Sequence, residues 1–345
     1  MTCPTTHHRR SLWLRVTFFV FVLCLVANVH AAEPAPLRAG MIGLDTSHVP
    51  SFVKFFNNPK ATGDVAGVIK VVAGYPGGTD LPSSRDRVKG FTEQLRGMGV
   101  EIVDSIPKLL EKVDVVLLES VDGRIHLQEA IPVIKAGKPL FIDKPVAGSL
   151  ADTIAIYELA KKQNVPCFSS SSLRYGLGIQ ELLQSEKLGT VAGAITWGSC
   201  SYQDGTPDMF FYGIHGIEPL YALMGTGCET VTRIQTKDTD LVSGVWKDGR
   251  IGTYRGIRSN KADFGFTAFG SKSIVQSGKE TGYDELCREI ARFFKTGKSP
   301  VRAEETIEIF AFMEAADESK RQGGAPVSLA SVMAKATAEA ARLIK

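Results

Sequence analysis

Residues 1–31 contain no aspartate or glutamate, although they carry three arginines. Their centre, Val16 to Val29, is a predominantly apolar run, and Val29-His30-Ala31 follows as a small-residue cleavage site. This order is typical of an export signal, so we expect residues 1–31 to be a cleaved signal peptide. The apolar run is shorter than the roughly 20 residues that a membrane-spanning helix needs, so we expect no stable membrane anchor.

The rest of the chain, residues 32–345, has no net charge. The whole chain contains 40 basic and 37 acidic side chains, and the three arginines within residues 1–31 account for the difference. This balance excludes a nucleic-acid partner recognised by bulk charge. We expect an exported protein, periplasmic or extracellular in a bacterium, and a chain of this length favours two domains.

Cysteines are few after residue 31. Cys167, Cys200, Cys228 and Cys287 are widely spaced and form no CxxC pair. They are therefore not a disulfide framework, although one bridge is compatible with export. Leu23 precedes Cys24 where lipoprotein processing needs a small residue, which argues against a lipid anchor.

Residues 37–170 alternate strand and helix signals. Ala39 to Gly43 is a short buried-strand run, and the apolar stripe that ends at Phe56 predicts a helix directly after it. Asp114 to Leu118 is a continuous strand of the kind found in parallel sheets. Five or six such units predict an α/β fold with a doubly wound, Rossmann-like parallel sheet.

Residues 171–345 show a different pattern. Several short strand signals occur between residues 194 and 269, and Asp248-Gly249 predicts a hairpin turn. We expect an α+β domain with a mainly antiparallel open sheet that has helices on one face. The chain closes with helix signals at 284–296, 303–321 and 329–344, which can pack back on the first domain.

The first strand-to-helix turn carries a broken phosphate-binding pattern. A GxGxxG fingerprint would place glycines at positions 43, 45 and 48, and only Gly43 is present, with Asp45 and His48 at the other two. An aspartate there repels the anion that the helix N-terminus should attract. The alternative is that Asp45, Thr46 and Ser47 only cap the next helix.

Lys144 follows the strand that ends at Ile142, at the sheet edge where open α/β folds bind ligands. Near a positive group its pKa can fall toward neutrality, which suits acid–base chemistry. The alternative is an exposed lysine in a turn.

Three histidines lie beyond residue 31. His48 and His126 follow strands of the first sheet and point to the edge that holds Lys144, and His215 begins a helix one turn before Glu218. Each can be structural. A metal site that combines them with a carboxylate is conceivable, but their spacing carries no ligand signature, so we expect no metal.

Together these segments resemble the Gfo/Idh/MocA family, named for glucose–fructose oxidoreductase and inositol dehydrogenase, over residues 37–345. Asp143-Lys144-Pro145 is similar to the family's Glu-Lys-Pro, and Ser120 to His126 resembles its Thr-Pro-x-x-x-His. Leu173-Arg174-Tyr175 resembles the opening of its second domain, and His215 with Glu218 resembles its His-x-x-Asp.

The resemblance implies an NAD- or NADP-dependent oxidoreductase that transfers hydride from a sugar, cyclitol or related polyol and forms a homo-oligomer. It implies Lys144 and His215 as catalytic residues. The implied cofactor-binding residues are Gly43, Asp45, Thr46, Ser47, His48, Ser120, His126, Asp143 and Lys144. The implied substrate-binding residues are Arg174, Tyr175, His215 and Glu218.

Departures from the family keep alternatives open. Phe211 stands where the family has a catalytic aspartate, so Glu218 or Asp208 would have to partner His215. One alternative is a carbohydrate-binding relative without redox turnover. Its stacking surfaces would be Trp197, Tyr202, Phe210 and Tyr212. Another alternative is NAD-assisted glycoside hydrolysis on the same fold.

Overall fold

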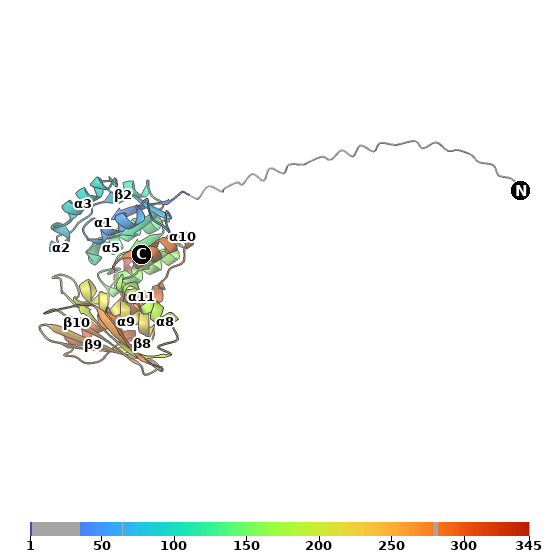
Figure 1. Ribbon diagram of the computed structural model, residues 1–345. Coiled ribbons are helices and arrows are strands. Elements are labelled where there is room, and N and C mark those ends of the chain that lie inside the picture. Colours follow the sequence, from blue (N-terminus) through green and yellow to red (C-terminus); the bar gives the residue numbers. More distant parts are fainter. Residues whose placement is uncertain (2–34, 64, 279–281, 345) are drawn as a thin grey trace. The chain divides into compact units, whose positions relative to one another are not determined.

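Six parallel strands form the first sheet of the computed structural model, which describes Met1 and residues 35–63, 65–278 and 282–344 (Figure 1). The expected signal peptide, residues 1–31, lies outside this range except for Met1. The strand order is β3-β2-β1-β4-β5-β6. The strands are β1 (Leu37–Ile42), β2 (Ile69–Tyr75), β3 (Glu101–Ile102), β4 (Val115–Leu118), β5 (Leu140–Ile142) and β6 (Cys167–Ser169).

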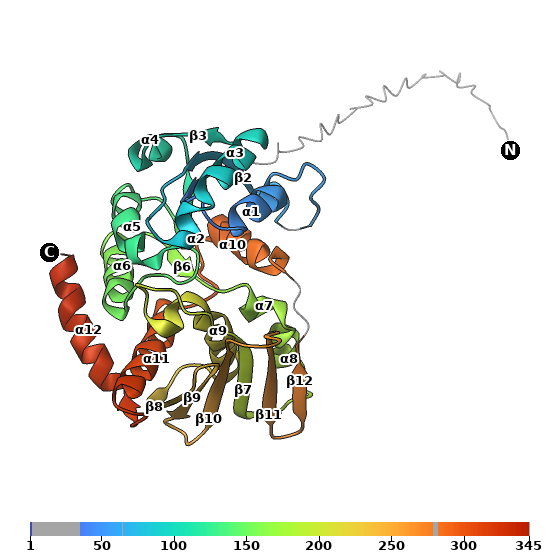
Figure 2. The same ribbon diagram turned by 90° about the vertical axis from the view of Figure 1, so that its left-hand side faces the viewer.

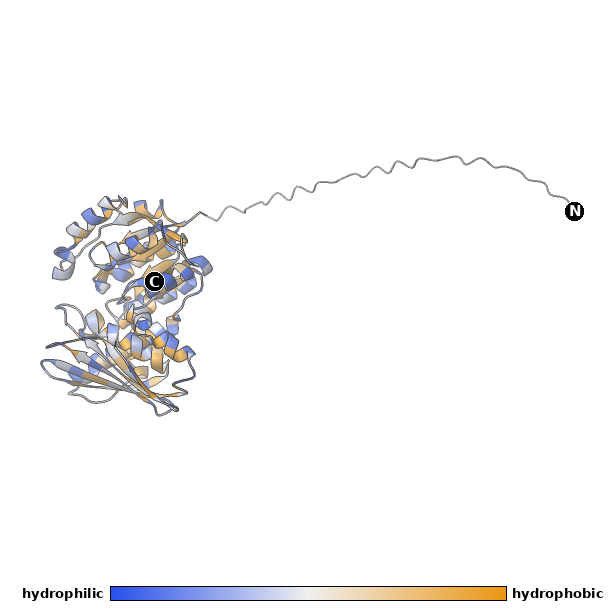
Figure 3. Cartoon of the chain, in the orientation of Figure 1, coloured by the Kyte–Doolittle hydropathy of each residue, from blue (hydrophilic) through white to orange (hydrophobic). Residues whose placement is uncertain are grey.

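Helices cover both faces of this sheet (Figure 1). Alternate residues of β1 and β4 bury into two different hydrophobic clusters, so both faces are packed and the strands read as continuous apolar runs. Figure 3 shows hydrophobic residues among these strands. The helices that connect the strands are α1 (His48–Phe56), α2 (Pro82–Arg85), α3 (Val88–Gly97), α4 (Ile106–Leu110), a 3₁₀ turn (Gly123–Ile125), α5 (His126–Lys135) and α6 (Leu150–Lys162).

The second sheet has seven strands in the order β12-β11-β7-β10-β9-β8-β13. Its pairs are antiparallel except for β7 with β10, which is parallel. The strands are β7 (Val191–Ser199), β8 (Cys228–Gln235), β9 (Thr239–Trp246), β10 (Ile251–Ile257), β11 (Gly265–Gly270), β12 (Ile274–Ser277) and β13 (Val327–Ser328). The parallel first sheet and the mainly antiparallel second sheet confirm the predicted fold class.

Helices pack on one face of the second sheet and then return to the first. α9 and α11 cover β7 and β8, α12 lies along α6, and α10 contacts α1 (Figure 2). The helices are α7 (Leu173–Gly176), α8 (Ile179–Gln184), a π-helix (Met209–Gly213), α9 (Ile214–Met224), α10 (Asp284–Thr296), α11 (Ala303–Arg321) and α12 (Leu329–Leu343).

Local signals in the sequence act as expected at two places. Ser149 Oγ accepts a hydrogen bond of 3.0 Å from the backbone N–H of Asp152 and so caps α6. The Asp248-Gly249 turn joins β9 to β10, and Gly249 has a positive φ, a left-handed conformation that favours glycine. The sequence signals did not identify β12, β13 or the π-helix, which are short.

None of the helices in the described part of the chain is both long and apolar enough to span a bilayer. Cys167, Cys200, Cys228 and Cys287 are all free thiols.

Candidate functional site

A cavity of about 180 Å³ lies at the carboxyl edge of the first sheet, and we call it the Lys144 cavity. Residues of both halves of the chain surround it, because the π-helix, α9 and the segment before β11 face the first sheet here. Its wall is formed by Thr46, Ser47, His48, Ser83, Arg87, Val121, Lys144, Ser172, Leu173, Phe211, Tyr212, His215, Phe264 and Tyr283.

Lys144 enters the cavity just after β5. Its Nζ stands 5.4 Å from the centre of the Tyr212 ring, a cation–π arrangement. Burial lowers the pKa of Lys144, and the charge of Arg87 lowers it further, while Asp143 and Glu119 oppose the change. The ammonium group therefore gives up a proton more readily than an exposed lysine does.

His215 reaches the same cavity from the first turn of α9. Its Nδ1 lies 2.7 Å from Ser171 Oγ, and the Tyr212 and Phe264 rings pack edge-on against it. Burial lowers the pKa of His215 well below its ordinary value, helped by the charges of Lys144 and His48. The imidazole is therefore neutral at pH 7, and Ser171 fixes its orientation.

His48 forms a third part of the wall. Its Nδ1 lies 2.5 Å from Asp143 Oδ2, and its ring stacks on Phe52 and meets the edge of Tyr283. Burial alone would raise the pKa of Asp143, but His48 and the neighbouring Lys144 together lower it. Asp143 therefore holds the ring of His48 in place, as a carboxylate orients an imidazole in many active sites.

Asp45 is completely buried and bridges two loops. Its carboxylate accepts a hydrogen bond of 2.8 Å from the backbone N–H of Val121, which follows β4, and one of 2.6 Å from the hydroxyl of Ser84 on α2. Burial raises the pKa of Asp45, and these two hydrogen bonds offset part of the rise. Asp45 thus occupies a position where a dinucleotide-binding turn would carry its second glycine.

A second, separate cavity of about 500 Å³ lies beyond the ends of β2 and β3, and we call it the Tyr75 cavity. Thr79 lines it and donates its backbone N–H to Ser84 Oγ, the same hydroxyl that donates to Asp45. Val121, the other partner of Asp45, lines the Lys144 cavity. The hydrogen bonds of Asp45 therefore lie at the junction of the two cavities.

Gly43 and Ser120 close the floor of this junction. A Cβ at Gly43 would lie 2.1 Å from Ser120 Oγ, and the φ of Gly43 is positive, so only glycine lets the two loops approach. The hydroxyl of Ser120 donates a hydrogen bond of 2.7 Å to the carboxylate of Glu129 on α5. Burial raises the pKa of Glu129 to about 7, and the charges of Asp45 and Asp122 add to the effect.

These residues do not fit a dinucleotide diphosphate. A Rossmann turn offers the diphosphate free backbone N–H groups at the start of the first helix. Here that turn carries Asp45, a buried carboxylate with the same sign of charge as the diphosphate, and Glu129 adds a second acidic group nearby.

Of the three histidines expected at this sheet edge, His126 does not line the Lys144 cavity. Its ring is fully buried, with Nε2 2.7 Å from the carbonyl of Ser120 and Nδ1 3.3 Å from that of Val146. Burial lowers its pKa. His126 joins the loops after β4 and β5, and so holds Lys144 in place without reaching the cavity.

The expected substrate residues Arg174, Tyr175 and Glu218 also lie outside the Lys144 cavity. Glu218 accepts a hydrogen bond of 2.7 Å from Arg174 Nε, and Arg174 also forms an ion pair with Glu305. Arg174 and Tyr175 line a different cavity beside α8 and α10. Glu218 is therefore not the partner of His215, a role that Ser171 fills.

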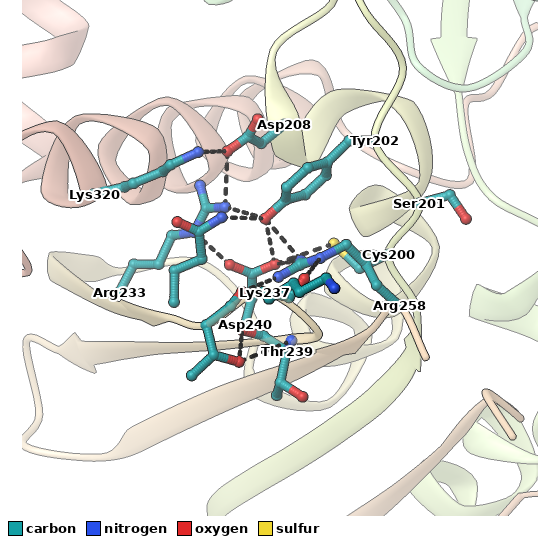
Figure 4. Close-up of polar contacts among 12 residues, drawn as sticks. Cys200, Ser201, Tyr202, Asp208, Arg233, Lys237, Thr239, Asp240, Arg258 and Lys320 are labelled. Carbon is teal, nitrogen blue, oxygen red and sulfur yellow. Dashed lines mark hydrogen bonds and ion pairs between the residues drawn. The ribbon is translucent and has the colours of Figure 1, made fainter. Parts of the chain in front are cut away.

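Asp208 is not that partner either, because it belongs to a charged network in the second half of the chain (Figure 4). Arg233 is buried there and contacts three carboxylates, those of Asp208, Asp240 and Asp317. The hydroxyl of Tyr202 donates a hydrogen bond of 2.6 Å to Asp240. This network ties the loop after β7 to β8, β9 and α11, and that loop leads into the π-helix.

The π-helix carries Phe211 and Tyr212 into the Lys144 cavity. π-helical turns are rare and recur at functional sites. Of the four aromatic residues expected as stacking surfaces, only Tyr212 reaches this cavity. Tyr202 belongs to the charged network, Phe210 packs on Phe310 in the core, and Trp197 lies over Gly265.

Sequence reasoning missed several residues that contact the cavity or its wall. Arg87, Ser172, Phe264 and Tyr283 line it, and none of them was predicted as a site residue. Ser84 was not predicted either. The three consecutive serines at 170–172, directly after a predicted strand, are the one signal that pointed toward Ser171.

Comparison with known proteins supports this fold. Residues 83–171 match the sequence profile of the Gfo/Idh/MocA oxidoreductase family with its NAD-binding Rossmann fold. The matched segment runs from α2 through the loop after β6 and includes Lys144, but it begins after the altered first turn. No curated protein matches the chain.

Solved structures share the fold over most of the chain. Myo-inositol 2-dehydrogenase from Lactobacillus plantarum is 16% identical with a TM-score of 0.68, covering 85% of this chain and 99% of that one. A probable dehydrogenase from Thermotoga maritima is 20% identical with a TM-score of 0.67, covering 86% and 100%. GenD2 from gentamicin A biosynthesis, solved with NAD, is 15% identical with a TM-score of 0.67, covering 86% and 97%. The fold is that of the NAD(P)-dependent oxidoreductases of this family.

Proposed function

We propose that this protein binds a sugar, cyclitol or related polyol in the Lys144 cavity, where one of its hydroxyl groups accepts a hydrogen bond from Lys144 and donates one to His215. The observation that carries the proposal is the convergence of these two side chains, from different halves of the chain, on one cavity of about 180 Å³. That volume suits a single small ring. The inositol dehydrogenases among the structural neighbours support a polyol as the ligand class.

The two groups have complementary protonation states. Lys144 is a hydrogen-bond donor with a lowered pKa, and His215, whose pKa is also lowered, is a neutral imidazole that can accept a hydrogen bond. The Tyr212 and Phe264 rings give the C–H faces of a polyol an apolar surface and exclude water. Arg87 and the hydroxyls of Thr46 and Ser47 provide donors for its remaining oxygens.

NAD(P)-dependent hydride transfer from the same polyol is the second candidate. The family profile over residues 83–171 and the fold favour it. The buried carboxylate of Asp45 opposes it, because a diphosphate bound at this turn would lie near a group with its own sign of charge. The geometry therefore supports the first candidate better.

One experiment separates the two candidates. The full chain is purified from its exported fraction, bound dinucleotide is sought by absorbance and mass spectrometry, and NADH, NADPH and a panel of polyols are titrated by calorimetry. We expect a polyol to bind and no dinucleotide to be present. Saturable NAD(P)H binding would establish the second candidate, and the absence of polyol binding would overturn both.

Two further features belong to this proposal. We propose export through residues 1–31, to be tested by N-terminal sequencing of the mature protein. We also propose that the chain forms a homo-oligomer through the helix-free face of the second sheet, where Ile195, Val245 and Ile251 are exposed. Light scattering of the native protein, compared with an Ile251→Lys variant, tests the oligomer.

A further inference from the structure

Three ligand-type side chains gather behind the wall of the Lys144 cavity. His48 begins α1, Glu119 follows β4, and Asp143 follows β5, so three elements of the first half of the chain meet here. A ring nitrogen of His48 and one carboxylate oxygen from each acid all lie within 4.8 Å of one another. Exposure is 6% for His48, 0% for Glu119 and 3% for Asp143. The helix α10 packs beside α1 and closes this region (Figure 2).

Glu119 lacks the partners that buried carboxylates require. Both of its oxygens are inaccessible to solvent, and neither has a hydrogen-bond donor among the described residues. By contrast, Asp45 accepts from Val121 and Ser84, and Glu129 accepts from Ser120. A buried polar group without a partner destabilises the fold, and a charged one does so more. Burial and the charges of Asp143 and Asp45 raise the pKa of Glu119 well above its ordinary value, so a cation bound there would take the place of a proton. Its two oxygens, unpartnered among the described residues, point to a partner supplied from outside the chain.

Lys144 does not fill that role. Its charge acts on Glu119, yet the two side chains share no hydrogen bond, and the Nζ of Lys144 stands over the Tyr212 ring instead. The contact between Lys144 and Asp143 is made by the backbone N–H, at 2.8 Å. The two carboxylates therefore lie close together, with the imidazole of His48 beside them.

We propose that His48, Glu119 and Asp143 bind one divalent transition-metal cation. One imidazole nitrogen and two carboxylate oxygens form a donor set that suits Zn²⁺ or Mn²⁺. Neighbouring ligand atoms around a tetrahedral ion with bonds of about 2.1 Å are about 3.4 Å apart. The ligand atoms, all within 4.8 Å of one another, need only small side-chain adjustments to reach that spacing. The two negative charges balance the +2 charge of the ion.

A cation here would join the start of α1 to the ends of β4 and β5. It would also fix the ring of His48, which forms part of the cavity wall. Asp143 already orients that ring through its 2.5 Å contact. With the ion bound, His48 and Asp143 would both coordinate the ion in place of this contact, and Glu119 would be the third ligand. The inference does not depend on the proposed function, since metal binding and polyol binding are measured separately.

The test begins with the metal content of the native full chain, purified without chelators and analysed by mass spectrometry of the elements. The protein is then stripped with a chelator and titrated with Zn²⁺, Mn²⁺ and Co²⁺ by calorimetry. Co²⁺ additionally reports nitrogen and oxygen ligation through its visible absorption. We expect one site per chain, a visible Co²⁺ spectrum and a higher Tm in the presence of the metal.

Glu119→Gln tests the assignment of the site, with Glu129→Gln as the matched control, because Glu129 is also a buried carboxylate but lies outside the cluster. We expect at least a hundredfold loss of metal affinity for Glu119→Gln and none for Glu129→Gln. Should Glu119→Gln fail to fold, the Co²⁺ titration of the stripped wild type decides. The proposal is overturned if the wild type binds none of the three ions or if a folded Glu119→Gln binds them equally well.

Discussion

Replacing Asp45 by glycine is predicted to open the junction between the two cavities. The carboxylate accepts hydrogen bonds from Val121 N–H and Ser84 Oγ, and hydrogen bonds to a charged group are worth about 1.5–3 kcal/mol each. Burial of the carboxylate is unfavourable and raises its pKa. The variant no longer buries this group, which offsets part of the stability lost with the hydrogen bonds. We therefore expect a net loss of about 3 kcal/mol and a fall in Tm of about 5 °C.

The same substitution should create a phosphate site. It removes the repelling charge from the turn that holds the diphosphate in a Rossmann fold, and it frees the N–H of Val121 and the hydroxyl of Ser84, which contact that turn. We expect Asp45→Gly to bind NADH measurably in a fluorescence titration, with an NADH-dependent rise in Tm, and the wild type to show neither.

Asp45→Asn is the matched control. Its amide oxygen can still accept from Val121 and its NH₂ group can donate to Ser84, so the bridge remains while the charge is lost. We expect nearly wild-type stability and no NADH binding. The reasoning is refuted if the wild type and Asp45→Asn bind NADH as tightly as Asp45→Gly, or if a folded Asp45→Gly gains no binding at all.

Three further predictions concern charge and stability. Lys144→Met should weaken polyol binding at least about tenfold, since it removes a charged hydrogen-bond donor, and an unchanged affinity by calorimetry would remove Lys144 from the site. Glu129 has a folded-state pKa of about 7 against an ordinary 4.5. Its contribution to stability is present below pH 4.5 and is lost as the pH rises through 7, by about 3 kcal/mol in all. We therefore expect the free energy of unfolding, measured in urea at pH 5 and pH 8, to change less with pH for Glu129→Gln than for the wild type. An identical pH dependence of the two proteins would contradict this. Arg233→Met removes the cation that pairs with the buried Asp317, while Asp240 keeps only Arg258, and it should cost about 3–5 kcal/mol. Breaking the partly exposed ion pair between Arg250 and Asp248 should cost at most about 1 kcal/mol. Equal losses in urea unfolding would show that burial does not control these pairs.

The fold was predictable because its signals are local. Continuous apolar runs mark the strands of the first sheet, and hydrophobic stripes mark the helices that pack on it. α11, for example, begins and ends at the predicted residues Ala303 and Arg321. The strands β12 and β13 were not predicted because they are too short for a period to show.

The candidate site was predictable only where a residue follows a strand of the first sheet or begins a helix. Lys144, His48 and His215 were expected at one edge, and all three line the Lys144 cavity. His126 met the same criterion but is buried, because the carbonyls of Ser120 and Val146 hold its ring. Position along the chain does not reveal which way a side chain turns.

The sequence by itself determined the two-sheet architecture, the edge that carries Lys144 and the missing glycines of the first turn. It does so because apolar periodicity and turn residues act over a few neighbours. Only the tertiary structure decided that Asp45 bridges two loops, that Ser171 is the partner of His215, and that Glu119 lies beside His48 and Asp143 without a donor. These contacts join residues that are far apart along the chain, and burial sets their energies, so they form only when the chain packs.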